Sequence, residues 1–119
     1  MILAALFLAA ADLPSPGGFY RSNQMEIGAA LELEPDGSFL YQLDYGAVSE
    51  SAEGRWTSDG TAVYLTSTRM SGAYRAGAFV REPLKIDGDR LLLNRYDTVI
   101  RFEREDLPAP VDRKIWGEN

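Results

Sequence analysis

The side chains that could do chemistry in this 119-residue chain are mainly carboxylates, because it has eighteen Asp and Glu residues and neither histidine nor cysteine. Two carboxylates at a set separation can hydrolyse a glycoside, but no spacing in the sequence singles out such a pair. The absence of histidine excludes Ser-His-Asp chemistry. A carboxylate enzyme is therefore the third-ranked hypothesis, and we predict no catalytic residues.

Metal and cofactor sites are not indicated either. Cys/His zinc sites, thiolate nucleophiles and disulfides need side chains that the chain lacks. Asp87-Gly88-Asp89 has too few oxygen ligands for a calcium loop and is explained as a turn. No glycine-rich loop precedes a helical pattern, so we expect no phosphate cradle. The net charge of −6 disfavours nucleic acid or an anionic membrane as a partner.

Aromatic and cationic side chains in two places are the candidates for binding. In 35–46, "PDGSFLYQLDYG", an aromatic or apolar residue occupies every second position from 39 to 45. We interpret that strand face first as core and second as the wall of a cavity, since a small barrel has room for either. The second place is a predicted loop at 67–77, whose arginines suit an anionic or polar partner. The candidate ligand-binding residues are Tyr41, Tyr45, Trp56, Arg69, Tyr74 and Arg75.

The elements that would position these residues are strands, because apolar residues recur with period two after residue 17. Asp-Gly turns between alternating runs are typical of hairpins. The pattern predicts an all-β fold of about eight antiparallel strands in an up-and-down meander closed into a small barrel. A two-sheet sandwich is the alternative. The expected strands are 18–21, 27–34, 38–45, 54–57, 61–66, 78–86, 90–95 and 98–104.

Finer expectations concern which side chains face inward. Tyr20 and Trp56, each in a Gly-x-aromatic pattern, are expected as inward anchors near one barrel end. The acidic segment 47–53 is expected to be a solvated connection. On strand 78–86 we expect Val80 to point inward, and a bulge at Pro83 to release Glu82 to solvent. The alternative is that Glu82 keeps the inward phase and sits at a cavity mouth.

The N-terminal residues indicate an exported protein. Residues 2–11, "ILAALFLAAA", form an apolar run too short to cross a membrane, which takes about 20 residues. The run fits a secretory signal with a small-residue cleavage site; the alternative is a buried N-terminal element of a cytoplasmic protein. We predict a signal at 1–11, a linker at 12–17, a barrel at 18–104 and a Pro-containing tail at 105–119. After cleavage no stable membrane anchor is expected. Trp116 in the tail either covers a strand edge or docks on a partner.

Between Gly18 and Arg104 the sequence resembles the NlpE-like lipoprotein domain and related lipocalin-like small barrels of the bacterial envelope. The matching features are "GFY" at 18–20, "LELEPDGSFLY", "GRW" at 54–56 before "DGTAVYLTS", and "LKIDGDRLLL" with "IRFER". The resemblance implies an exported barrel concerned with envelope sensing or small-ligand binding. It does not extend to metal sensing or lipid anchoring, because the lipobox cysteine and the Cys-x-x-Cys of the copper-linked members are absent.

Together these observations predict a soluble, periplasmic or secreted, lipocalin-like module that is non-catalytic and binds a small ligand or an envelope protein. The alternative is a structural, protein-interaction or inhibitor domain that uses loop 67–77 and the C-terminal tail. The filling of the barrel interior is the observation that best separates the two.

Overall fold

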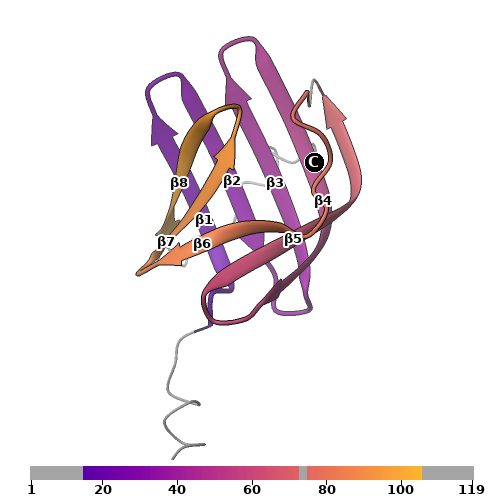
Figure 1. Cartoon of the computed structure of the whole chain (residues 1–119), viewed down its shortest axis with the longest axis vertical. Coiled ribbons are helices and arrows are strands. Elements are labelled where there is room, and N and C mark those ends of the chain that lie inside the picture. Colours follow the sequence, from indigo (N-terminus) through magenta and orange to yellow (C-terminus); the bar gives the residue numbers. More distant parts are fainter. Residues whose placement is uncertain (1–14, 73–74, 106–119) are drawn as a thin grey trace, which may run out of the picture.

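The structure, a computed structural model, describes residues 15–72 and 75–105. Eight antiparallel strands follow one another around a closed barrel in which the last strand pairs with the first (Figure 1). The predicted meander barrel is confirmed, rather than the two-sheet sandwich. No helix in these two ranges is long and apolar enough to cross a membrane. The strands are β1 (Gly18–Gln24), β2 (Ile27–Leu33), β3 (Ser38–Tyr45), β4 (Val48–Ser58), β5 (Ala62–Gly72), β6 (Glu82–Asp87), β7 (Arg90–Arg95) and β8 (Thr98–Glu105).

Turn chemistry explains where the hairpins reverse. The Asp36 carboxylate accepts hydrogen bonds from the backbone N–H and the hydroxyl of Ser38, at 2.9 and 2.7 Å. The Asp59 carboxylate likewise accepts from the N–H groups of Thr61 and Ala62, at 2.9 and 3.0 Å. These bonds stabilise the ionised form and lower the pKa of both carboxyls. The predicted Asp-Gly turns are therefore real chain reversals.

Apolar side chains at alternate strand positions fill the interior of the barrel. In the strand that prompted the core interpretation, Phe39 is 1% exposed and Tyr41 and Leu43 are 0% exposed, while Tyr45 is half-buried against the same core. The core interpretation of this face is thus confirmed. The largest fully buried side chains are Tyr20, Tyr41, Phe39, Phe79, Phe102, Leu31, Leu33, Leu43, Leu65, Leu84, Leu91 and Leu93.

Polar contacts close the barrel end where β1 begins, which we call the Tyr20 end. The Tyr20 hydroxyl donates to the carbonyl of Pro16 at 2.6 Å and accepts from Arg104 Nη2 at 2.9 Å. Trp56 packs against the core, and its indole N–H donates to the carbonyl of Glu34 at 2.8 Å. Both residues are inward anchors near one end, as predicted, because each has a polar tip that finds a backbone acceptor at the barrel mouth.

Two predicted connections are in fact strand. All of the segment 47–53 except its first residue belongs to β4, where Val48, Glu50 and Ala52 are buried at alternate positions. Its alternation was hidden because the inward residues include a carboxylate and a small alanine. The predicted loop 67–77 begins as the second half of β5, past an irregularity in register at Glu53/Gly54. That shift changes the phase of the strand and turns Met70 toward the core.

The strand predicted at 78–86 also differs. β6 begins only at Glu82, and Val80 is 80% exposed while Phe79 takes the buried position at 1%. The bulge expected at Pro83 is absent from the β5–β6 ladder, which pairs Tyr64 with Pro83 and Leu65 with Glu82 in unbroken register. Glu82 therefore keeps the inward phase and is half-buried at a barrel end.

Candidate functional site

A buried ion pair lies at the opposite end of the barrel, which we call the Tyr96 end. The side chains of Glu50 and Arg95 are 0% and 3% exposed. Arg95 donates from Nε to one carboxylate oxygen at 2.6 Å and from Nη2 to the other at 3.1 Å. The hydroxyls of Tyr41 and Tyr96 donate to the same two oxygens at 2.7 and 2.6 Å. Each oxygen thus accepts two hydrogen bonds, which offsets the penalty of burying the charge.

The electrostatics of this cluster hold its donors protonated. Burial and then the neighbouring Glu50 carboxylate raise the pKa of Tyr41. Burial and the hydrogen bond to Glu50 raise the pKa of Tyr96. Burial opposes the charged form of Arg95, but its hydrogen bonds to Glu50 and the charge of that carboxylate leave the Arg95 pKa raised. These three donors therefore keep their protons near neutral pH and hold the Glu50 carboxylate in place.

The turn between β7 and β8 has a strained backbone conformation, in which the Tyr96 side chain points toward this cluster. Tyr96 and Asp97 have φ angles of 55° and 57°, in the left-handed region. That conformation costs about 1–2 kcal/mol for a residue other than glycine. The Tyr96 ring packs edge-on to Tyr45 with centroids 6.3 Å apart and lies 5.3 Å from the Arg95 guanidinium. These contacts hold the strained turn in one position.

The segment between β5 and β6 packs over the same end. Arg95 Nη2 donates to the carbonyl of Gly77 at 2.7 Å. The Phe79 ring stands 4.6 Å from the Arg95 guanidinium and 4.8 Å from the Tyr41 ring, edge-on. Ser67 N–H donates to the Phe79 carbonyl at 2.9 Å, which anchors the segment to β5. The interior at this end is therefore occupied by Phe79 and the ion pair.

Outside the cluster, the Tyr96 end presents two grooves and exposed apolar side chains. A groove of about 390 Å³ lies between Tyr45 and Arg75, and one of about 470 Å³ lies on the other side of Tyr96, beside Val99. Met25 is 89% exposed and Val99 40% exposed. We call Met25, Tyr45, Arg75, Tyr96 and Val99 the rim surface.

Gln24 joins two parts of the rim surface. The β1–β8 ladder stops at the pair Arg21 and Glu103. Beyond it, the Gln24 amide donates to the carbonyl of Val99 at 3.2 Å and accepts from the N–H of Arg101 at 2.7 Å. The side chain thus replaces a missing backbone pair. Met25, the next residue, is held on the same side of the barrel as Val99.

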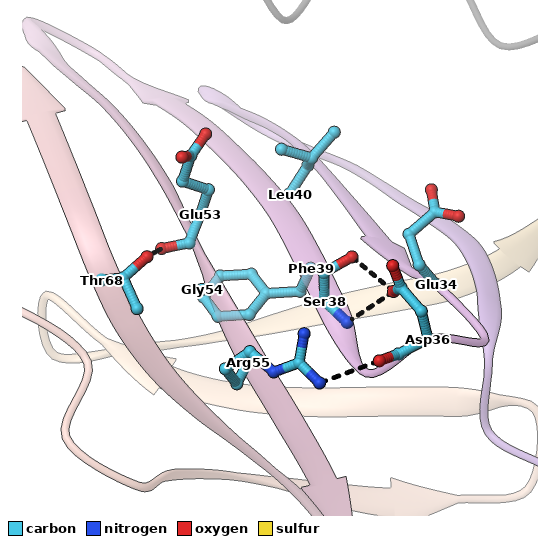
Figure 2. Close-up of a pocket in the computed structure, with 9 residues that line it drawn as sticks. All are labelled: Glu34, Asp36, Ser38, Phe39, Leu40, Glu53, Gly54, Arg55 and Thr68. Carbon is cyan, nitrogen blue, oxygen red and sulfur yellow. Dashed lines mark hydrogen bonds between the residues drawn. The ribbon is translucent and has the colours of Figure 1, made fainter.

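A third groove, of about 480 Å³, lies on the outside of β3 and β4 near the Tyr20 end (Figure 2). Its polar groups are mostly engaged with one another. Arg55 Nη2 donates to the carbonyl of Asp36 at 2.8 Å, and the Asp36 carboxylate accepts from Ser38. Thr68 donates to the carbonyl of Glu53 at 3.3 Å. The groove is therefore a surface depression between the β2–β3 turn and the register irregularity of β4, and its polar groups bind one another.

The structure brings together only some of the sequence-predicted residues. Tyr41 lies in the buried cluster, and Tyr45 and Arg75 line one groove at the Tyr96 end. Trp56 lies at the opposite end of the barrel. Arg69 is exposed on β5 and pairs with Glu53 at 3.1 Å. Tyr74 lies outside the described residues.

Sequence reasoning missed the residues at the centre of the cluster. Glu50 was assigned to a solvated connection, although it alternates with Val48 and Ala52. Arg95 has the phase of Leu91 and Leu93, which could have identified it as an inward-facing charge. A charged residue at a core phase is therefore the signal that could have found this site.

Within residues 15–72 and 75–105, no three His, Cys, Asp or Glu side chains are placed to hold a metal ion. No family model, curated protein or solved structure matches the chain. The resemblance to NlpE-like and lipocalin-like barrels thus stays a prediction.

Proposed function

We propose that this chain is a non-catalytic protein-binding module that recognises its partner with the rim surface at the Tyr96 end. The observation that carries the proposal is the exposure of Met25, at 89%, and Val99, at 40%, beside two half-buried tyrosines. Exposed apolar and aromatic side chains next to an arginine are typical of the centre of a protein interface. The buried ion pair and the strained turn keep this surface rigid, which lowers the entropy lost on binding.

The filled interior favours binding on the outside of the barrel. A carrier of the lipocalin type holds its ligand between the strands. Here that space contains large buried side chains, and the inward-facing charges of Glu50 and Arg95 neutralise each other. An enclosed ligand would have to displace them.

A small ligand bound in a groove is the second candidate. The groove between Tyr45 and Arg75 combines an aromatic wall with an exposed guanidinium. Such a site suits a small aromatic anion. Under this candidate, aromatic carboxylates raise the melting temperature of the native chain but not that of Arg75→Ala.

The proposed module acts outside the cytoplasm. Support comes from the apolar run at 2–11 and from the absence of cysteine, which leaves the fold independent of the redox compartment. Mass spectrometry of the protein from its native host should find a mature N-terminus at Asp12. A chain that retains residues 1–11 would contradict export by cleavage.

The test of the rim surface is a pair of matched variants. Partners captured from the envelope fraction of the native host are identified and titrated against the native chain, Met25→Ser/Val99→Ser and Val80→Ser. Val80 is 80% exposed on the segment between β5 and β6 and is not one of the five rim residues, so it controls for loss of one exposed apolar side chain near the same barrel end. We expect the double variant to weaken binding at least about tenfold, as for interface hot spots, and Val80→Ser to leave it unchanged. Equal binding by all three proteins would refute the proposal.

A further inference from the structure

The outward face of β2 forms a shallow channel of small residues on the barrel wall. Gly28, Ala30 and Glu32 have the outward phase, opposite to that of Leu31. We call these three outward residues the outer trough. A groove of about 320 Å³ lies over Gly28 and Ala30, between polar side chains of β1 and β3. Outward positions of a small barrel normally face water, yet Ala30 and Glu32 are only 5% and 9% exposed.

The neighbours of the outer trough define what it suits. Phe19 and Leu40 pair with Glu32 from either side, so an apolar wall flanks the carboxylate. Gln42, which pairs with Ala30, has a buried Oε1 that no donor of residues 15–72 and 75–105 reaches. A buried acceptor of this kind is normally satisfied by a hydrogen-bond donor, so the position suits an occupant that carries an N–H or O–H group. Asp44, opposite Gly28, adds a second carboxylate.

Charge continues beyond the trough on the same outer surface. The Leu40 and Glu53 side chains lie side by side on one face of the sheet in Figure 2, with the Glu34 carboxylate at the edge of the groove. One cation is close by, Arg21, whose guanidinium lies 5.2 Å from the Phe19 ring. The face therefore suits an occupant with apolar side chains, N–H donors and positive charge.

The chain itself supplies such a segment within reach. β8 ends at Glu105, which pairs with Phe19, and Phe19 pairs with Glu32. At about 4.8 Å per strand, the chain leaves the barrel roughly 10 Å from the outer trough. Residues 106–119 lie outside the described part of the chain, and eight of them, 106–113, can extend over up to about 26 Å. Among them is the sequence Arg113-Lys114-Ile115-Trp116, two cations followed by two large apolar side chains.

We propose that residues 113–116 dock in the outer trough of their own barrel. Arg113 and Lys114 then lie near the carboxylates of the trough, Ile115 and Trp116 cover Ala30 and its apolar flanks, and an N–H of the segment satisfies Gln42. The tail thus covers a sheet face, rather than the strand edge considered for Trp116. This inference concerns a different surface from the rim and does not depend on it.

Because the chain has no cysteine, two introduced cysteines are the only thiols that can react in a disulfide test. The full-length chain is prepared as Ala30→Cys/Ile115→Cys and as the control Val80→Cys/Ile115→Cys, whose first site is also on the surface but away from the trough. Under mild oxidation we expect the first pair to form an intramolecular disulfide at least about tenfold faster than the control, because docking raises the effective concentration. Adding Arg113→Glu/Lys114→Glu should slow the reaction of the first pair.

The alternative outcomes overturn the proposal. Equal rates for the two pairs would mean that the tail has no preferred position. Disulfide-linked dimers that increase with protein concentration would assign the outer trough to a second copy of the chain. A second readout needs no cysteine: acrylamide should quench Trp116 fluorescence more strongly in Arg113→Glu/Lys114→Glu than in the native chain, against the same Trp56 background. Equal quenching in both proteins would refute docking by charge.

Discussion

Removing one partner of the buried ion pair should be among the most damaging single substitutions in this barrel. Arg95→Met keeps an unbranched apolar stem but removes the guanidinium. Among the described residues, the Glu50 carboxylate, at 0% exposure, then keeps the hydroxyls of Tyr41 and Tyr96 as donors. Breaking a buried pair in this way costs about 3–5 kcal/mol. Loss of the guanidinium contacts with the Phe79 and Tyr96 rings adds about 0.5–1 kcal/mol each.

The expected loss of unfolding free energy in Arg95→Met is large enough to be measured by denaturant unfolding. A domain of this length has a free energy of unfolding of about 5–15 kcal/mol, so a total loss of about 4–7 kcal/mol removes a large part of the stability of the variant. Urea unfolding at pH 7, followed by tryptophan fluorescence and circular dichroism, gives the free energy with an unchanged m value if the native state stays compact.

A double variant separates burial of a lone charge from loss of packing. Glu50→Leu/Arg95→Met replaces both charges with apolar side chains, which is often neutral or stabilising. Two tyrosine hydroxyls then lose an acceptor, at about 1 kcal/mol each. We expect the double variant to lie within about 2 kcal/mol of the native chain. If Arg95→Met costs less than about 1 kcal/mol, or if the single losses simply add in the double, the reasoning is wrong.

The remaining predictions concern backbone fit and alkaline pH, each measured by urea unfolding. Gly54→Ala places a Cβ 2.1 Å from the carbonyl oxygen of Thr66, so the free energy of unfolding should fall by about 1–3 kcal/mol. Gly28→Ala, whose new Cβ has no atom of the described residues within 4 Å, is its matched control and should gain up to about 1 kcal/mol; a loss there would contradict the argument. Asp97→Gly relieves a φ of 57° and should gain about 0.5 kcal/mol, whereas a loss would show that the turn is not strained. The raised pKa of Tyr41 means that the unfolded chain releases this proton first, so the stability is full below pH 10 and falls above it. Tyr41→Phe should flatten that decline, by up to about 1.4 kcal/mol per pH unit, and an unchanged slope would refute the assignment.

Much of the fold could be read from local pattern. The turns at Asp36 and Asp59 reverse the chain where their carboxylates bind nearby N–H groups. Period-two alternation then assigns faces within each strand, which is why Phe39, Tyr41 and Leu43 were correctly placed inside. Both signals act over a few residues, so the sequence contains them in full.

The candidate site could not be read in the same way. Glu50 and Arg95 are 45 residues apart and meet only because the barrel closes. Arg95 has the phase of the core residues Leu91 and Leu93, but the sequence does not show which distant residue accepts its hydrogen bonds. The same holds for the rim surface, which joins residues in or beside four different connections between strands.

The amino-acid sequence by itself determined that apolar and polar residues alternate along the strands, that the chain turns at Asp-Gly and that it encloses an apolar core. These features follow from short-range steric and hydrogen-bonding preferences. The tertiary structure decided which charge meets which, where the phase of β5 changes, and that Phe79 rather than Val80 enters the core. Those outcomes depend on competition for the same interior space among residues from distant strands, and that competition is settled only when the sheet closes.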